Sequence, residues 1–376
     1  MAGIYIHIPF CRQACHYCDF HFSTNLENRK PIVQAIGREL TLRQPYLARQ
    51  VVNTIYFGGG TPSLLSTEEQ RYLLNVIADN FETVPAPEIT LEANPDDLTE
   101  AVLTDLRAAG FNRLSIGIQS FDDNILHFLN RAHNSDASLG CFDLARKAGF
   151  SNISIDLIYA IPGQDDAGWH RNIDEALKLA PEHLSAYALT IEEKTVFGRW
   201  SAQGKFHPAG EDVAARQLEL LTDRLATAGY QHYEVSNFAL PGYISQHNSS
   251  YWREHHYLGV GPSAHSFNGL SRQFNVSNNH LYRQALEAGT IPATLEVLSR
   301  EDRINEYLLT TLRTSWGADL EKLKSELQYD IMSVHKMYVE TLLDEKLACL
   351  DKGVLILTGK GKLLADKISS DLFATA

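Results

Sequence analysis

The sequence lacks the features that mark several common classes of protein. No part of its 376 residues approaches the run of about 20 apolar residues that a membrane-spanning helix requires. Its start has neither the basic residues nor the cleavage site of a signal peptide. No block of Lys and Arg interrupts a formal net charge of −13, so a surface that follows nucleic acid is not indicated. We therefore expect a soluble cytoplasmic protein with no nucleic-acid partner.

Cysteine is also scarce, with five residues in the chain. An odd and sparse count argues against a disulfide framework. Cys141 and Cys349 stand alone in apolar surroundings, and we interpret both as small buried hydrophobic residues. The other three, Cys11, Cys15 and Cys18, lie close together in the sequence and require a chemical explanation.

Strand-like and helix-like stretches alternate over the first two thirds of the chain. Short segments rich in Ile, Leu, Tyr and Phe predict buried strands at residues 5–8, 54–57, 88–92, 113–118, 153–159 and 184–190. Amphipathic stretches predict helices at 31–42, 67–81, 122–130, 135–148 and 165–179. This alternation predicts an α/β fold with a parallel sheet. Six units are too few for a closed eight-unit barrel and favour an open, partial (β/α)6 barrel, with its site at the C-terminal ends of the strands.

The rest of the chain has a different character. Residues 231–298 are dense in His, Asn and aromatic residues and predict loops with short strands. Residues 299–376 predict a small helical, winged-helix-like domain, with helices at 303–313, 319–327, 331–346 and 358–368 and a hairpin at 347–357. Its acidic residues slightly outnumber its basic ones, so we favour a packing or lid role over DNA binding. The predicted domains are therefore residues 1–230, 231–298 and 299–376.

The spacing of Cys11, Cys15 and Cys18 is the strongest signal in the sequence. Thiolates suit iron–sulfur clusters and zinc, but a zinc site usually completes four ligands with a second Cys or His pair. Three thiolates on a cubane cluster leave one iron open to a small molecule. A structural zinc site and three unrelated core cysteines are the alternatives.

This C-x3-C-x2-C pattern resembles that of the radical SAM superfamily. The resemblance implies a [4Fe–4S] cluster on the three cysteines, with S-adenosylmethionine bound at the open iron. The opening residues 5–11 also resemble the oxygen-independent coproporphyrinogen III oxidase-like family. The catalytic members of that family have a fourth cysteine where Phe20 stands here.

Further motifs of the same family follow the predicted strands. Adjacent glycines let a ligand approach the backbone, and free N–H groups there can bind a carboxylate. The resemblance implies that S-adenosylmethionine is bound by Tyr5, Tyr17, Gly59, Gly60, Thr61 and Glu92, and that Gln119, Arg131 and Asp156 match positions that contact a second such molecule. A plain tight turn at the glycines and a hydrogen-bond network at the barrel mouth are the alternatives. The family's usual glycine before residues 161–163 is Ala160 here.

His247 opens the segment His-Asn-Ser-Ser-Tyr-Trp. Imidazole is a common axial ligand of haem iron, and Tyr and Trp offer flat faces to a porphyrin. A lone histidine among aromatic residues is more often structural, but H-N-x-x-Y-W resembles the signature of the haem-chaperone branch of this family. His255 and His256 are candidates for accessory ligands.

The resemblance implies a protein that binds haem through His247 and transfers it to haem-accepting apo-proteins. A peripheral contact with the membrane is one setting for that transfer. No catalytic residue is assigned. Two rival interpretations stay open: a coproporphyrinogen III dehydrogenase that uses two molecules of S-adenosylmethionine for oxidative decarboxylation, and a structural iron–sulfur protein that transfers no ligand.

Overall fold

The computed structural model describes residues 1–375, and its main body is one sheet of twelve strands. The strands are β1 Ala2–Ile8, β2 Val52–Gly59, β3 Thr83–Ala93, β4 Arg113–Gln119, β5 Ile153–Tyr159, β6 His183–Ala188, β7 Gln231–Glu234, β8 Asn237–Ala239, β9 His256–Val260, β10 His265–Phe267, β11 Ser271–Asn275 and β12 Ala293–Val297. The helices of this body are α1 Arg29–Leu42, α2 Thr67–Asn80, α3 Glu100–Ala109, α4 Asp123–Phe128, α5 Ser135–Lys147, α6 Asp166–Leu179, α7 Val196–Ala202, α8 Glu211–Thr227, α9 Gln246–Trp252 and α10 Asn279–Glu287.

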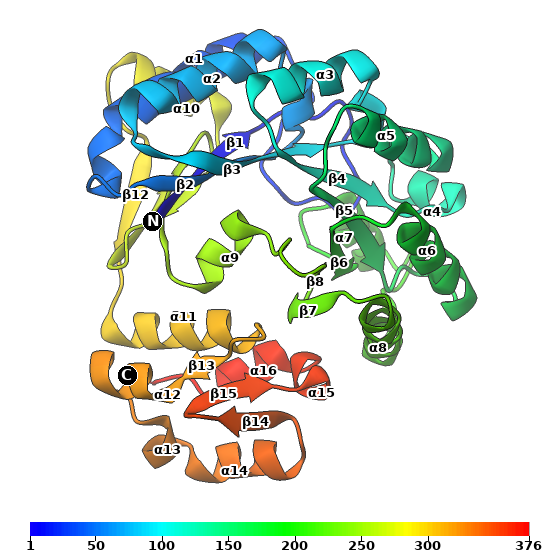
Figure 1. The fold of residues 1–376 in the computed structure, drawn as a ribbon, viewed down its shortest axis with the longest axis vertical. Coiled ribbons are helices and arrows are strands. Elements are labelled where there is room, and N and C mark those ends of the chain that lie inside the picture. Colours follow the sequence, from blue (N-terminus) through cyan, green and yellow to red (C-terminus); the bar gives the residue numbers. More distant parts are fainter. Residues whose placement is uncertain (376) are drawn as a thin grey trace.

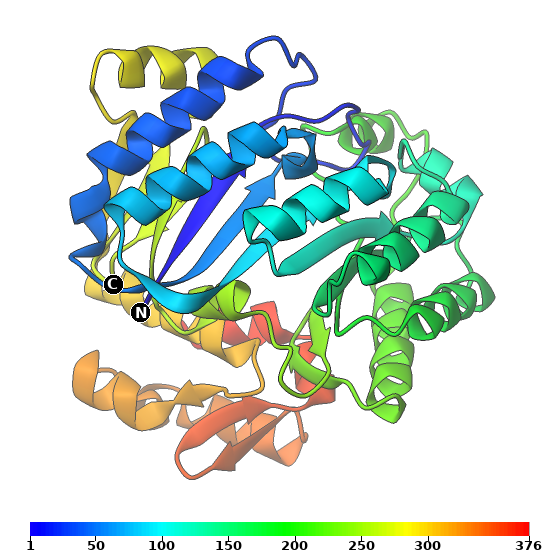
Figure 2. The same cartoon turned by 45° about the horizontal axis from the view of Figure 1, so that its top comes forward.

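Strands β1 to β6 lie side by side in chain order, and each pairs in parallel with the next. Helices α1, α2, α3, α5 and α6 cover their outer face (Figures 1 and 2). The apolar side chains of these strands are buried against the helices in one large core, as parallel sheets covered by helices require. The predicted α/β fold with a partial (β/α)6 barrel is therefore confirmed. The sixth strand ends at Ala188, two residues before the predicted end.

Strands from the middle of the chain extend this sheet at both ends. At one end β9 pairs in parallel with β1, and β10, β11 and β12 continue antiparallel. At the other end β8 and β7 continue antiparallel from β6. The short strands predicted for residues 231–298 are thus present. The division of the chain at residues 230 and 298 stays a prediction.

The segment from Gln246 to Trp252 is helix α9, where we had predicted loops and short strands. The Ser245 hydroxyl caps its start by accepting a hydrogen bond from the N–H of Asn248. The helix contacts β1, β2 and the first helix of the C-terminal domain, and Figure 1 shows it between the sheet and that domain. Packing on both sides stabilises a helix whose composition alone does not favour one.

The C-terminal domain has its own hydrophobic core. Its elements are α11 Arg300–Leu312, β13 Ala318–Asp319, α12 Leu320–Glu326, α13 Ile331–Val334, α14 Lys336–Asp344, β14 Ala348–Asp351, β15 Val354–Leu357, α15 Gly359–Lys362 and α16 Ala365–Asp371. The predicted helical domain with a hairpin is confirmed, and β13 adds a third strand to the hairpin. The helix predicted over 331–346 is divided at His335, whose Nε2 hydrogen-bonds to the hydroxyl of Tyr329.

The two isolated cysteines have different environments. Cys141 is buried on α5, as predicted. Cys349 is exposed on β14, so its prediction as a buried residue was wrong. The hairpin pairs with a strand on one side only, and the outer face of β14 points away from the domain core.

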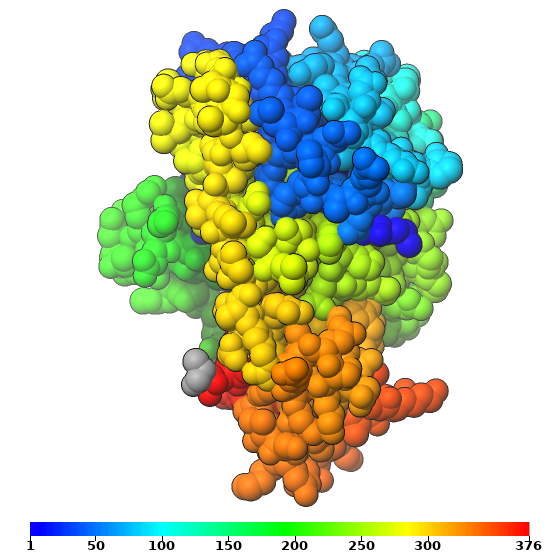
Figure 3. Space-filling model, turned by 90° about the vertical axis from the view of Figure 1, so that its left-hand side faces the viewer, coloured from blue at the N-terminus to red at the C-terminus, as the bar shows by residue number. Residues whose placement is uncertain are grey.

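An ion pair with a buried carboxylate and a backbone contact join the C-terminal domain to the sheet. Glu234, which is 1% exposed, pairs with Arg313 at 2.8 Å. The N–H of Val235 donates to the carbonyl of Arg313 (3.0 Å). Figure 3 shows the segment before α11 (yellow) running along one face from α10 to this domain. Within residues 1–375, none of the helices combines the length and apolar character needed to cross a bilayer.

Candidate cluster site and adjoining cavity

The loop after β1 carries the three clustered cysteines. Its two ends are tied together, because the N–H of Cys11 donates to the carbonyl of Ser23 (3.1 Å) and the N–H of Ser23 donates to that of Pro9 (2.9 Å). Its middle is tied to the segment after α4, where Asn130 Nδ2 donates to the carbonyl of Ala14 (2.7 Å). The loop therefore holds three half-buried thiols in a fixed arrangement at the C-terminal end of β1.

The three thiols lie within electrostatic reach of one another. Burial raises the pKa of Cys11 to about 11 and the pKa of Cys18 to about 12, and the neighbouring thiols of the set add to both shifts. Without a bound cation these two side chains are thus protonated at neutral pH. Binding of a metal centre has to displace their protons, as is general for thiolate ligands.

A chain of hydrogen-bond donors leads from Arg131 to the thiols. Arg131 Nη2 donates to Asn94 Oδ1, and Asn94 Nδ2 donates to Thr61 Oγ1 (3.2 Å). The Thr61 hydroxyl then donates to Cys11, which lowers the pKa of that thiol against the effect of burial.

Arg131 also donates through Nη1 to Cys15 Sγ and to the hydroxyl of Tyr17, both at 3.4 Å. Two donors of this network reach a sulfur directly, Arg131 Nη1 at Cys15 and the Thr61 hydroxyl at Cys11, and the others orient these two. Such an arrangement stabilises negative charge on the thiolates. The network brings together three of the predicted motifs: the cysteine loop, Thr61 after the glycines and Arg131.

The glycines before Thr61 are used differently from our prediction. We expected free N–H groups there, but Gly59 N–H donates to Glu92 Oε2 (3.1 Å) and Gly60 N–H donates to the carbonyl of Ile8 (2.9 Å). The prediction of free N–H groups was therefore wrong. The glycines are needed because β2 ends very close to β1: a Cβ on Gly59, whose φ is +104°, would lie 2.5 Å from the ring of His7. A ligand at this turn would meet backbone carbonyls and bare Cα atoms.

Glu92 and Asp156 face the interior of the barrel. Glu92 accepts a hydrogen bond from the hydroxyl of Tyr56 (2.8 Å), and burial raises its pKa to about 7. Burial likewise raises the pKa of Asp156 to about 6, although Ser185 and Ser115 donate to its carboxylate. Two carboxylates that resist ionisation in the absence of a cation suit a site for a positively charged ligand.

Arg113 is the charged residue of this interior that the sequence did not reveal. It is 1% exposed, and its Nε and Nη1 have no hydrogen-bond partner within the described part of the chain. Its guanidinium lowers the pKa of Glu92 and of Asp156 against the effect of burial. A charged residue at the start of an otherwise apolar strand was the signal that could have identified it. Asn94, which stands in the quoted E-x-N-P segment, was also not assigned a role.

Gln119 ends β4 in a left-handed backbone conformation with φ +66°. A Cβ on Gly117 would lie 2.8 Å from Gln119 Nε2 and 3.5 Å from Arg131 Nη2. Because Gly117 has no side chain, the side chains of Gln119 and Arg131 both have room at the barrel mouth. Ala160 adopts φ +55°, the conformation for which glycine is usual.

His247 is buried beneath this site, with 1% of its surface exposed. Its Nδ1 hydrogen-bonds to the hydroxyl of Thr54 (2.8 Å) and its Nε2 to the hydroxyl of Tyr251 (2.9 Å). The ring stacks on Tyr56, with 5.0 Å between ring centroids. Burial and the charge of Arg113 lower the pKa of His247 to about 3, so the imidazole is neutral. A direct contact between His247 and haem stays a prediction, and in this structure both ring nitrogens already have partners.

A cavity of about 640 Å³ opens beside this cluster of aromatic residues. It lies between the end of the cysteine loop, the end of α9, strands β10 and β11, and α11. Six aromatic side chains contribute to its wall: Tyr5, Phe20, Tyr251, Trp252, Tyr257 and Phe267. Its volume and aromatic lining are typical of sites for small organic molecules.

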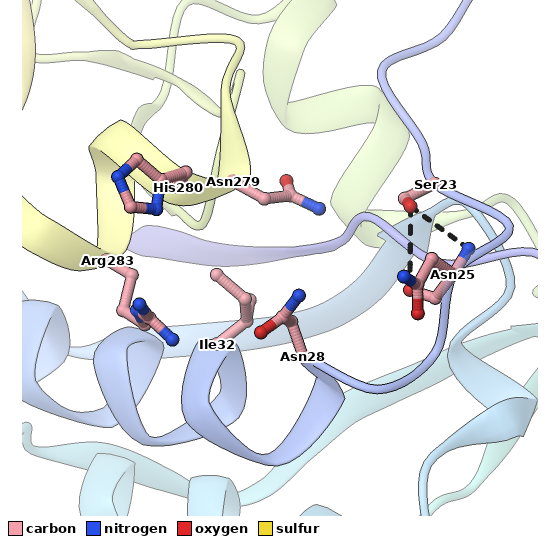
Figure 4. Close-up of a pocket in the computed structure, with 7 residues that line it drawn as sticks. All are labelled: Ser23, Asn25, Asn28, Ile32, Asn279, His280 and Arg283. Carbon is pink, nitrogen blue, oxygen red and sulfur yellow. Dashed lines mark hydrogen bonds between the residues drawn. The ribbon is translucent and has the colours of Figure 1, made fainter.

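A second cavity of about 190 Å³ lies between α1 and α10 (Figure 4). Asn28 and Ile32 line it from α1, and Asn279, His280 and Arg283 line it from α10. Its remaining walls come from the loop before α1, where Ser23 and Asn25 hydrogen-bond to each other. This cavity contains none of the residues predicted to bind a cofactor.

The thiols do not converge on a single point. Within residues 1–375, no three Cys, His, Asp or Glu side chains come close enough together to hold one metal ion. The thiolates of a cubane cluster bind separate irons and need no common point.

The fold and the cysteine site define a radical SAM protein. The radical SAM superfamily model matches residues 5–176, and the HemN C-terminal domain model matches residues 298–364. The heme chaperone HemW of Mycobacterium tuberculosis is 35% identical over 371 residues, which cover 97% of this chain and 93% of that protein. The HemW of Bacillus subtilis is 33% identical over 373 residues, or 98% of each chain. The chain belongs to the heme chaperone HemW family.

Among solved structures, the chain is similar to coproporphyrinogen III oxidase (HemN) from Escherichia coli, described as a radical SAM enzyme. The TM-score is 0.84 with 25% sequence identity, over 99% of this chain and 90% of that one. The similarity thus extends over the barrel and the C-terminal domain together.

Proposed function

We propose that this protein is a haem chaperone of the cytoplasm, which binds haem and transfers it to acceptor apo-proteins. Its barrel carries a [4Fe–4S] cluster on Cys11, Cys15 and Cys18. The observation that carries the proposal is the aromatic cavity of about 640 Å³ that adjoins both the cysteine loop and the end of α9. The full-length similarity to proteins named heme chaperone HemW supports it.

The residues around the thiols fit the cluster. Arg131 and Thr61 donate toward Cys15 and Cys11, so the site favours negative charge on sulfur. Burial alone would keep the thiols protonated, and a cluster would supply the positive charge that the loop lacks. When bound, the cluster offers one open iron to the amino and carboxylate groups of S-adenosylmethionine.

The residues inside the barrel fit S-adenosylmethionine, whose sulfonium is cationic. Glu92 has a raised pKa because it is buried without a full cationic partner. Gly59, Gly60 and Thr61 leave room for a ligand at the backbone. Tyr5 stacks on Tyr56 beside Glu92, and Tyr17 lies within the cysteine loop next to Arg131. The barrel mouth is completed by Gln119, Arg131 and Asp156. Arg131 there donates to Cys15 and Tyr17 of the cysteine loop.

The cavity fits a porphyrin. Tyr251 and Trp252 present aromatic surface to it from the end of α9, and Phe20, which is 70% exposed, does so from the cysteine loop. The catalytic relatives have a fourth cysteine at the position of Phe20. In this chain the same position offers an apolar ring to the cavity. His247 acts on this surface through its hydrogen bond to Tyr251.

A titration of haem into the anaerobically reconstituted protein tests the proposal. We expect a saturable Soret band, and a decrease of that band when an apo-haemoprotein is added as acceptor. A protein that shows no saturable change with haem would contradict the proposed function.

The similarity to HemN supports one alternative function, the oxidative decarboxylation of coproporphyrinogen III. Incubation with reductant, S-adenosylmethionine and coproporphyrinogen III distinguishes the two functions. The chaperone proposal predicts no catalytic release of CO2, and multiple turnovers would establish the enzyme instead.

A further inference from the structure

The cavity beside the cysteine loop contains more than aromatic surface. Three histidines line it: His7 from β1, His21 from the cysteine loop and His265 from β10. An arginine, Arg272 of β11, also lines it. Haem offers two groups that a protein can bind: an iron that takes an axial ligand, and propionates that pair with a cation. We therefore ask which of these four side chains has a nitrogen free to bind either group.

The three histidines differ in the nitrogen atoms that they leave available. His7 uses both, because Nδ1 hydrogen-bonds to the hydroxyl of Tyr5 (3.2 Å) and Nε2 to the carbonyl of His21 (2.9 Å). His21 uses Nε2 in a hydrogen bond to Asn279 Oδ1 (2.8 Å). His265 has no hydrogen-bond partner for either ring nitrogen anywhere in residues 1–375, and it is exposed to the cavity.

The ring of His265 is nevertheless held in place. It stacks on Phe274 of the neighbouring strand, with 5.6 Å between ring centroids and 29° between the planes. The backbone of His265 pairs with Phe274 across β10 and β11. A ring that is fixed by stacking and has free nitrogens is prepared to ligate a metal.

Arg272 lies close by on β11. Its Nε pairs with Glu306 at 2.8 Å and its guanidinium lies over the ring of Phe267, 5.7 Å from the centroid. Arg272 is only partly buried and lines the cavity, so its guanidinium can donate to a second carboxylate in addition to Glu306. Two further carboxylates line the cavity: Glu254, which pairs with Lys322 at 2.6 Å, and Asp19 in the cysteine loop.

The nitrogens of His247 are engaged differently from those of His265. Its two nitrogens are bonded to Thr54 and Tyr251, and it lies behind Tyr251 as seen from the cavity. Its contribution is to fix the Tyr251 hydroxyl. The histidine of the H-N-x-x-Y-W segment is therefore a positioning residue for the aromatic wall.

We propose that the cavity is the haem site, with His265 as the axial ligand of the iron and Arg272 as the partner of a propionate. This assignment rests on the proposed function as a haem chaperone. It predicts that the two ends of the haem are bound by neighbouring strands β10 and β11, while Tyr251 and Trp252 contact its face.

The test uses the full-length, cluster-reconstituted protein and two probes, ferric haem and iron-free protoporphyrin IX. His265→Ala should weaken haem binding by about tenfold or more and abolish the spectrum of imidazole-ligated iron. The affinity for protoporphyrin IX should change less than about twofold, because no iron is present to lose a ligand. Free imidazole should restore the spectrum in the variant. His280→Ala, an exposed histidine of the smaller cavity, is the matched control.

A second pair of probes tests Arg272. Arg272→Gln should weaken binding of haem but not of haem dimethyl ester, which lacks propionate charges. His247→Ala should weaken haem and protoporphyrin IX alike, since it disturbs the wall and not the iron.

The outcomes distinguish a failure of the proposed haem-chaperone function from a failure of the assigned haem site. If the wild-type protein binds no haem, the proposed function fails. If it binds haem and His265→Ala binds it with the same affinity and spectrum, the function stands and the assigned site is wrong. Equal loss of haem and protoporphyrin IX in His265→Ala would also reject axial ligation by this residue.

Discussion

The carboxylate of Glu92 allows a quantitative test of the barrel interior. Burial raises its pKa from 4.5 to about 7 even though Tyr56 and Gly59 donate to it. The stability that the neutral form contributes is complete below pH 4.5, and it is lost as the pH rises toward 7. A shift of this size corresponds to about 3 kcal/mol. We reduce the expected effect to about 2 kcal/mol because the side chain of Glu92 is half-buried and solvent screens part of the shift.

Glu92→Gln removes this titration and keeps the shape of the side chain. The free energy of unfolding of the variant, relative to that of the wild type, should rise by about 2 kcal/mol between pH 4.5 and pH 8. Urea denaturation of the cluster-free protein at the two pH values, followed by circular dichroism, measures this difference. If the substitution weakens a hydrogen bond, it lowers the free energy of unfolding by a similar amount at both pH values, so this contribution cancels in the difference. Glu68→Gln on the exposed side of α2 is the matched control, and a difference for Glu92→Gln that does not vary with pH would refute the reasoning.

Three further predictions concern the backbone, the cluster and the aromatic wall. Ala160→Gly should raise the free energy of unfolding by about 0.5–1 kcal/mol, because Ala160 adopts φ +55°; an unchanged urea midpoint would contradict this. Arg131→Gln should lower the cluster midpoint potential by about 50 mV, since it removes a positive charge 3.4 Å from Cys15 Sγ; Arg131→Lys should keep most of the potential in an EPR-monitored redox titration, and equal values for all three proteins would reject the effect. Tyr251→Phe should weaken haem and protoporphyrin IX binding equally in fluorescence and Soret titrations, because it leaves His247 Nε2 without its partner; a loss confined to haem would point to an iron ligand instead.

The barrel could be predicted from the sequence because its signals are local. The apolar segment 153–159 became β5 with the same limits, and the predicted alternation of strands and helices gave the observed sheet order. The 17 residues of α8, Glu211–Thr227, were not identified as a helix. That helix follows α7 and a loop, not a strand, and the strand after it, β7, is an antiparallel edge strand that does not continue the parallel βα rhythm.

The errors arose where tertiary contacts decide. The N–H of Gly59 donates to the carboxylate of Glu92, and the N–H of Gly60 donates to the carbonyl of Ile8. Both acceptors are far from the glycines in sequence. Helix α9 forms on His, Asn and Ser residues because it packs between β1, β2 and α11. Neither fact is contained in local composition, which is what predicted free N–H groups and a loop.

The site was predictable in its residue types but not in its connections. The spacing of the cysteines identified the loop, and the family motifs identified Arg131 and Thr61. The link between them runs through Asn94, and no periodicity or spacing indicates that link. The partner of His247 Nδ1, Thr54, could be learned only from the packing of α9 on β2, and the partner of Nε2, Tyr251, only from the formation of α9 itself.

The central claim is that Cys11, Cys15 and Cys18 hold a cubane cluster with one open iron. Mössbauer spectroscopy of the protein reconstituted anaerobically with 57Fe and sulfide tests it most directly. We predict the quadrupole doublet of a [4Fe–4S] cluster, a change at one iron site on addition of S-adenosylmethionine, and loss of the cluster signal in Cys15→Ser. Reconstituted protein that shows only adventitious iron, or a Cys15→Ser variant that keeps an intact cubane signal, would contradict the account.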